Sequence, residues 1–126
     1  MEEAEPLLRE GLKGCRRTLG NEHLDTLYAA CRLGSLLLTQ GKAAEGAQLV
    51  REAVKTARLT RGNEDRDYLS MSATLASLLA HQGLPAEAEQ IYVEVIETSR
   101  RTLGREDILT IRAAGDWAGI LSHQQI

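Results

Sequence analysis

The amino-acid sequence predicts an all-α fold, an α-solenoid of antiparallel helix pairs with about six helices and no strand. Three observations carry this prediction: a period of 42 fills all 126 residues, apolar residues recur at helical spacing inside each period, and aromatic residues are scarce, with one Trp, three Tyr and no Phe. A core built from Leu, Ile, Val and Ala favours closely packed helices. We therefore treat residues 1–126 as a single array of three periods.

The period is visible in columns of identical residues, a column being a set of positions separated by 42. Eight columns are identical in all three periods, whereas composition alone gives roughly one by chance. The repeat is therefore real. The columns are Gly20, Gly62 and Gly104; Gln40, Gln82 and Gln124; Arg16, Arg58 and Arg100; Thr18, Thr60 and Thr102; Glu3, Glu45 and Glu87; Glu10, Glu52 and Glu94; Glu22, Glu64 and Glu106; and Leu37, Leu79 and Leu121.

Glycine residues mark the expected helix ends. Gly20, Gly62 and Gly104 follow one set of apolar-periodic segments, and Gly41 and Gly83 follow the other. A helix commonly ends at a residue in the left-handed conformation, which glycine adopts without steric cost. Each period therefore contains two helices.

Other residues mark the expected helix starts. Asp65 and Asp107 suit the N-cap position, and Pro85 suits the first helical position. Pro6 interrupts the first helical segment, so the ordered part of that helix should begin near Pro6. The helices are expected near residues 6–18, 24–40, 43–60, 66–82, 85–102 and 108–124.

The apolar positions divide these helices into two classes. The first-class helices, near 24–40, 66–82 and 108–124, share one apolar face, and the other three, the second-class helices, share another. Small residues such as Gly34 and Gly46 let two backbones approach. Because no pair can bury both faces alone, each hairpin must stack on the next. The first-class face consists of Leu27, Ala30, Leu33, Gly34 and Leu37 with their counterparts 42 and 84 residues later.

The segment from Leu19 to Gly62 closely resembles a tetratricopeptide repeat of the 42-residue type found in kinesin light chains, and the resemblance covers the whole chain. One departure is that Leu24 stands where the family usually has proline, in His-Pro-Asp-Thr. The motif residues that carry the resemblance are Leu33, Gly34 and Leu37, then Gln40 and Gly41, then Glu87, Ala88 and Glu89, and finally Leu103 and Gly104.

The resemblance implies a right-handed superhelix whose first-class helices line a concave groove for extended or helical peptide segments of partner proteins. The implied lining is mostly small and weakly polar. The groove residues would be Tyr28, Cys31, Arg32, Ser35, Thr39, Ser70, Ala73, Thr74, Ser77, His81, Arg112, Gly115, Asp116, Gly119 and His123.

Two peptide-recognition modes of related proteins lack their residues in this chain. In kinesin light chains an Asn recurs immediately before the Leu that corresponds to Leu33. In this chain that column holds Arg32, Thr74 and Asp116. Chaperone-binding tetratricopeptide domains clamp a terminal carboxylate with Lys, Asn and Arg, and of these only Arg112 has a counterpart. We expect neither ligand.

Composition and charge exclude several function classes. A formal charge of -3 and a pI near 5.6 argue against a nucleic-acid binder. The acidic start and the short apolar run from Leu33 to Leu38 predict neither a secretory signal nor a membrane span, which indicates a cytoplasmic protein. No nucleophile, base and oxyanion donor converge, so an enzyme is the least favoured class and no cofactor is expected.

Histidine and cysteine residues are candidates for metal or redox sites. His81 and His123 share a column, but stacked helices lie about 10 Å apart, too far for both rings to reach one ion. Cys15 and Cys31 form no CxxC pair, so they are interpreted as small helical residues, and only Cys15, beside Arg16, has a cationic neighbour.

The arginine column could form a basic stripe with its neighbours Arg17, Arg61, Arg101 and Arg105. We favour a simpler interpretation. Cations near helix C-termini interact favourably with the helix dipole, and each exposed cation stabilises its helix by about 1 kcal/mol at most.

The array begins with a second-class helix and finishes with a first-class helix, so each terminal helix lacks one neighbour. This predicts either an excerpt of a longer array or a chain that associates with itself, head to tail or about a twofold axis. The expected self-association residues are Leu7, Leu8, Leu12, Trp117, Ile120, Leu121 and Ile126.

The leading expectation is a non-enzymatic scaffold that binds a peptide segment of a partner protein in the groove. The alternative is a structural or self-assembling spacer whose groove stays empty. Both expectations concern protein partners, and neither involves nucleic acid or a membrane.

Overall fold

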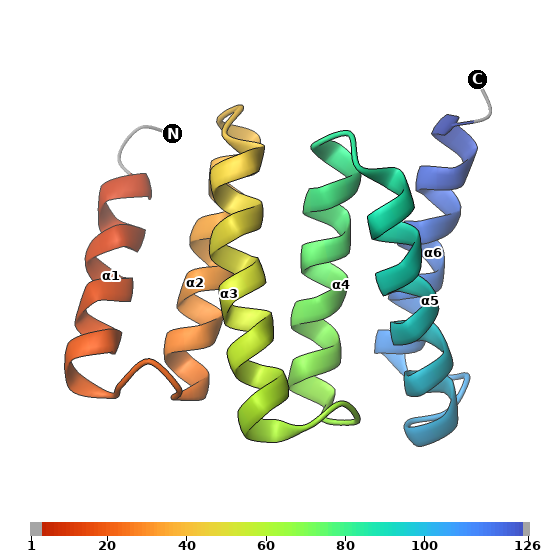
Figure 1. Cartoon of the computed structure of the whole chain (residues 1–126), viewed down its shortest axis with the longest axis horizontal. Coiled ribbons are helices and arrows are strands. Elements are labelled where there is room, and N and C mark those ends of the chain that lie inside the picture. The colour runs from red at the N-terminus through yellow and green to blue at the C-terminus, as the bar shows by residue number, and fades with distance from the viewer. Residues whose placement is uncertain (1–3, 125–126) are drawn as a thin grey trace.

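The computed structural model describes residues 4–124, with side chains up to Ser122. No strand is present in this range, and the predicted all-α solenoid of six helices is confirmed (Figure 1). The helices are α1 (Ala4–Thr18), α2 (Leu24–Thr39), α3 (Ala43–Arg61), α4 (Arg66–His81), α5 (Pro85–Thr102) and α6 (Ile108–Gln124).

The helices form two layers that extend in one direction. Each helix packs on the one before it and the one after it, and in addition α2 packs on α4 and α4 packs on α6. The first-class helices α2, α4 and α6 therefore form one layer, and the second-class helices α1, α3 and α5 form the other. The first and last helices, α1 and α6, lie at opposite ends of the array (Figure 1).

Glycine ends the helices as predicted. All five interhelix glycines have positive φ, between 80° and 97°. After Gly41, the amide of Lys42 donates to the carbonyl of Leu37 at 2.8 Å, and after Gly83 the amide of Leu84 donates to the carbonyl of Leu79 at 2.9 Å. These bonds satisfy carbonyls that the helix itself leaves without a donor.

The predicted helix starts are also present. Asp65 Oδ2 accepts a hydrogen bond from the amide of Tyr68 at 3.0 Å, and Asp107 Oδ1 accepts one from the amide of Leu109 at 2.9 Å. Pro85 occupies the first position of α5. Each side chain thus satisfies an amide donor in the first turn, or removes one that would have no partner.

The first helix starts slightly earlier than its expected start near Pro6: α1 begins at Ala4. Pro6 therefore lies within the first turn, where backbone amides have no intrahelical acceptor, so the missing amide hydrogen of proline breaks no helical bond.

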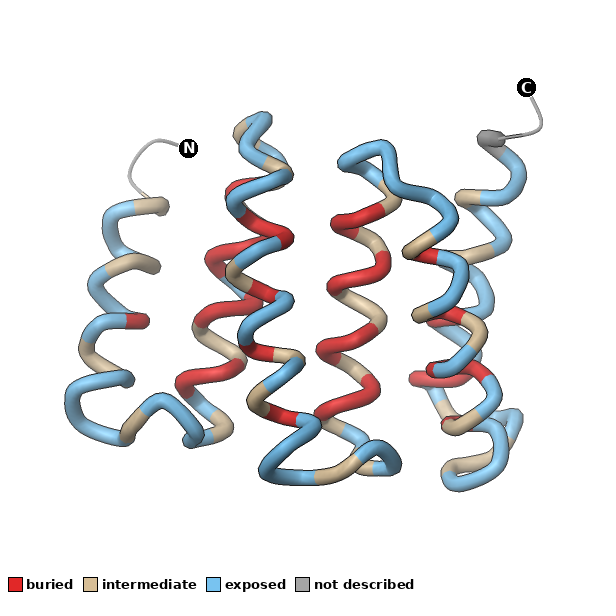
Figure 2. Tube along the Cα trace, in the orientation of Figure 1, coloured by how far each residue is buried: buried red, intermediate tan, exposed pale blue. Residues whose placement is uncertain are grey.

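The core lies between the two layers and is deepest in the middle of the array (Figure 2). Leu37 and Leu79, which belong to one column, are both 0% exposed. Tyr92 and Val50 of the second-class helices are also fully buried. Buried aliphatic side chains of this size each contribute about 1.5–3 kcal/mol relative to exposure, so this layer supplies the main stabilisation.

The α2 and α3 backbones meet at two glycines. A Cβ atom added to Gly34 would lie 2.4 Å from Cγ2 of Val50 and 2.9 Å from the carbonyl oxygen of Gly46. A Cβ atom added to Gly46 would lie 2.5 Å from the carbonyl oxygen of Gly34. The predicted close approach is therefore confirmed, and the absence of side chains at both positions permits it.

We predict that Gly34→Ala lowers the free energy of unfolding by about 1–3 kcal/mol, because α2 and α3 must separate to admit the methyl group. Chemical denaturation followed by circular dichroism measures the change. The matched control is Gly14→Ala, a helical position where an added Cβ meets nothing within 4 Å. At that position the substitution should raise the free energy of unfolding by about 0.5–1 kcal/mol, because Ala has a higher helix propensity than Gly. Equal effects at both sites would contradict the close-approach argument.

Asp65 gives a pH-dependent prediction. Burial acts to raise the pKa of its carboxyl group, but hydrogen bonds from Arg61 and from the amide of Tyr68 outweigh burial, so the pKa is lowered on folding. The resulting stabilisation is present above the unfolded pKa, about 3.9, and is lost as pH falls through the lower folded value.

At neutral pH, Asp65→Ala should cost about 1 kcal/mol through loss of the N-cap. Asp65→Asn should keep most of the cap and lose this residue's pH dependence. Urea unfolding at neutral pH and near pH 3 measures both effects. An Asn variant with the same acid sensitivity as the parent chain would refute the assignment.

Candidate peptide-binding groove

A hollow of about 230 Å³ lies between the three first-class helices. It is smaller than typical sites for drug-sized ligands, about 300–1,000 Å³, and is the size of one or two side chains. Most of its lining was predicted from the sequence. The predicted residues that line it are Ser35 of α2, Ser70, Ala73, Thr74 and Ser77 of α4, and Arg112 and Asp116 of α6.

The hollow combines a partly apolar floor with a charged side. Leu78 and Leu109 contribute buried apolar surface. Arg112 and Asp116, one helical turn apart on α6, are both exposed, and neither forms an ion pair within the part of the chain that the structure describes. The α6 side of the groove can therefore offer both a cation and an anion to a ligand.

Tyr92 of α5 adds a buried hydroxyl group beneath this region. Its side chain is fully buried, and its hydroxyl lies beside the side chain of Ser77, which lines the hollow. Burial raises the pKa of Tyr92 to about 12, and the negative charge of Asp116 adds to the increase. Because Ser77 lines the hollow, the hydroxyl lies close to the groove.

Two predicted groove residues lie elsewhere. Tyr28 and Arg32 line a separate hollow of about 250 Å³ between α1 and α2. The Tyr28 hydroxyl donates to Asp67 Oδ1 of α4 at 2.5 Å. Burial first and this hydrogen bond second raise the pKa of Tyr28 to about 12. Tyr28 therefore links two successive first-class helices.

Cys31 was predicted to line the groove, but it is buried and belongs to the core, so it does not line the hollow. Thr39, His81, Gly115 and Gly119 are exposed but do not line the hollow.

His123, the last predicted groove residue, has its side chain outside the described residues. The Nδ1 atom of His81 lies 2.7 Å from the carbonyl oxygen of Ser77 in its own helix. In the tautomer with a proton on Nδ1, that atom donates to the carbonyl.

Sequence reasoning missed the apolar part of the groove. Leu38, Leu78, Leu109 and Ala113 line the hollow, but none was predicted to do so. A helical signal was available, since Leu109 and Ala113 lie on the same helix face as Asp116, at spacings of three or four residues.

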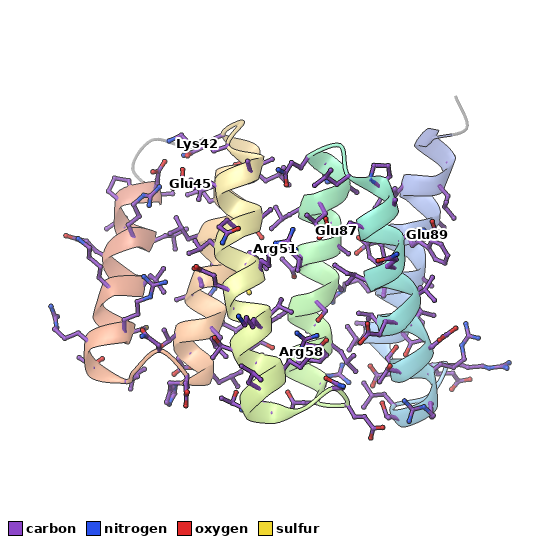
Figure 3. The ribbon with its side chains drawn as sticks, in the orientation of Figure 1. Lys42, Glu45, Arg51, Arg58, Glu87 and Glu89 are labelled. Atoms are coloured by element: carbon purple, nitrogen blue, oxygen red, sulfur yellow. The ribbon has the colours of Figure 1, made fainter. Side chains whose placement is uncertain are left out.

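A second type of hollow repeats on the opposite side of the array. One, of about 260 Å³, is lined by Arg16 and Glu52, and the next, of about 330 Å³, by Arg58 and Glu94. These pairs are 42 residues apart. The arginines lie in the last turns of their helices, as the dipole interpretation requires. Figure 3 shows Arg58 near the end of α3.

Ion pairs repeat across this face as well. Arg9 donates to Glu45 at 2.8 Å, and Arg51, 42 residues later, donates to Glu87 at 2.7 Å. Figure 3 shows Arg51 and Glu87 in the region between α3 and α5. All four side chains are between 40% and 53% exposed, so each pair contributes only about 0.2–1 kcal/mol. Their regular spacing nevertheless relates each second-class helix to the next.

The predicted self-association residues differ in exposure. Leu12 is 4% exposed, so its assignment to an open surface is wrong: it faces α2 and is covered by it. Leu7 and Leu121 are exposed. The remaining residues are Leu8, Trp117 and Ile120, which are partly buried against the core, and Ile126, which lies outside the described residues.

Neither a metal-binding cluster nor a membrane-spanning helix is present in the described residues. No group of three or more His, Cys, Asp or Glu side chains gathers there in a metal-binding arrangement. Nor does any helix between residues 4 and 124 combine the length and apolar character needed to cross a membrane.

The two cysteines should differ sharply in reactivity. Cys31 is buried, and burial raises the pKa of its thiol to about 12, whereas Cys15 is partly exposed. A thiolate is the reactive species, so a thiol reagent at pH 8 should label Cys15 quickly and Cys31 only after unfolding. Mass spectrometry over time measures this, and rapid labelling of a Cys15→Ser variant would contradict it.

Comparison with known proteins identifies the repeat. The family model described as Tetratricopeptide repeat matches residues 1–25 and 69–108, which is more than half of the chain. A search of curated proteins finds no match. Together with the helical solenoid, the match shows that this chain belongs to the tetratricopeptide repeat family, whose domains generally bind protein partners.

Proposed function

We propose that this chain is a non-enzymatic scaffold that binds a peptide segment of a partner protein in the groove between α2, α4 and α6. The observation that carries the proposal is the hollow at the centre of this layer. Three successive first-class helices contribute to it, so a segment that crosses them contacts all three periods.

The lining favours a short apolar side chain flanked by charge. The floor includes Leu78, Leu109 and Ala113, and small residues such as Ala73 keep the hollow open. Arg112 and Asp116 are exposed beside it. We infer that the preferred segment inserts one apolar residue and places an acidic residue near Arg112.

The experiment is selection of peptides from a random library on the immobilised chain, followed by titration calorimetry with the selected peptides. Arg112→Glu should weaken binding by roughly 10- to 100-fold, because a charged hydrogen bond is replaced by repulsion. Arg16→Glu, an exposed charge reversal on the opposite face, is the matched control and should leave the affinity unchanged.

A second variant tests the hollow itself. Ala73→Leu should fill it and abolish selection, whereas Ala44→Leu, at an exposed position of α3, should not. Circular dichroism checks that both variants remain folded. If no peptide is selected, or if Ala73→Leu and Arg112→Glu both bind like the parent chain, the groove is not the binding site, as expected of a spacer.

A further inference from the structure

One face of α6 is apolar and exposed although the same columns are buried in α2 and α4. Ile111 is 57% exposed, whereas its counterparts Leu27 and Leu69 are 3% and 0% exposed. Ala114 and Ala118 on this face are exposed too. In α2 and α4 these columns are covered by the following helix. Within residues 4–124 no helix follows α6 to cover them (Figure 2).

A cleft at the other end of the array has the complementary shape. It is the hollow of about 250 Å³ between α1 and α2, with Leu8, Gly11 and Cys15 on its α1 side and Asp25 on its α2 side. Gly11 is exposed, and a Cβ atom added there would meet nothing within 4 Å. Its counterpart Ala53 is buried, since it lies beside α2.

The chain itself shows what fills such a cleft. α2 packs on both α3 and α4, which are the counterparts of α1 and α2 in the next period. Gly34 of α2 contacts Gly46 of α3, and Tyr28 of α2 donates to Asp67 of α4. A cleft of this type therefore accepts a first-class helix, and α6 is the first-class helix whose outer face is exposed.

We propose that α6 of one molecule occupies the cleft between α1 and α2 of a second copy of this chain, so that the 42-residue period continues from molecule to molecule. Because α6 shares its columns with α2, and α1 and α2 share theirs with α3 and α4, each position in the contact of α2 with the α3–α4 pair has a counterpart between α6 and the α1–α2 pair of the next copy. At the closest crossing, Ala118 meets Ala4, in the columns of Gly34 and Gly46.

Charges in the same register are complementary. Within the chain, Glu64 accepts a hydrogen bond from Arg101 at 2.8 Å. Glu106 belongs to the column of Glu64, and Arg17 belongs to the column of Arg101. The proposed contact therefore places Glu106 of one copy beside Arg17 of the next copy. Both are exposed, and neither forms an ion pair within the described residues. Opposite charges therefore face each other across the joint.

A second pair follows from the Tyr28–Asp67 hydrogen bond. The same step of 39 residues takes Arg112 to Asp25 of the next copy, and Asp25 lines the cleft. The register thus pairs an arginine with a carboxylate twice. Arg112 also lines the groove, so the test below uses only Glu106 and Arg17, which lie outside it.

The first test is sedimentation velocity of the 126-residue chain over a dilution series. A head-to-tail contact leaves a free α6 face and a free cleft on every growing assembly. The average mass should therefore rise with concentration beyond that of a dimer. A strict monomer at high micromolar concentration overturns the proposal, and so does a mass that stops at a dimer, which indicates a twofold contact between like ends.

The second test is a charge exchange. Glu106→Arg alone and Arg17→Glu alone should each weaken association by about tenfold. Mixing these two variants should restore assembly, because each joint in the mixture can again pair opposite charges. Failure of the mixture to assemble, with both variants folded by circular dichroism, overturns the register.

Glu22→Arg is the matched control. Glu22 belongs to the column of Glu106 and is also exposed, but the corresponding step takes it to Leu59 of its own chain. Its reversal should leave association unchanged. If Glu22→Arg weakens association as much as Glu106→Arg does, the effect comes from net charge and the proposed joint is wrong.

Discussion

The structure depends on covering each first-class helix from both sides by second-class helices. Leu37 of α2 and Leu79 of α4 are 0% exposed, whereas Leu121 of α6, in the same column, is 37% exposed. The residue and its column are unchanged, so the difference comes from the neighbour alone. Burial in this array is therefore a property of adjacent helices, and stability follows from nearest-neighbour contacts rather than from one central core.

The same constraint explains which columns vary between periods. Positions that face the next helix stay small or aliphatic, as at Gly34 and Ala76, because the backbones approach closely there. Positions that face the groove change freely, as with Thr74 of α4 and Asp116 of α6, which share one column. Because the packing positions are constrained and the groove positions are not, the repeat can keep its fold while its ligand chemistry changes.

The period and the glycine spacing were sufficient to predict the fold class, because both act locally or between neighbours. The groove was predicted only in part. Cys31 and Leu12 proved buried, and the burial of a residue at the edge of a helix depends on the side chains of the adjacent helix. His23 was also missed: its Nδ1 atom caps α2 by accepting from the amide of Asp25 at 3.1 Å, a role that Asp65 fills in the next period.

The ion pairs between successive periods determine which residues of neighbouring second-class helices meet, and they add little to stability. Each exposed pair, such as Arg51 with Glu87, is weak by itself. The Gly34–Gly46 crossing fixes how α2 sits on α3, whereas the exposed pairs join α1 to α3 and α3 to α5, which do not otherwise pack on each other. A slide of one turn between these second-class helices would separate the pairs. Apolar burial therefore holds neighbouring helices together, while the charge pattern determines which residues meet, inside the chain and at any joint between copies.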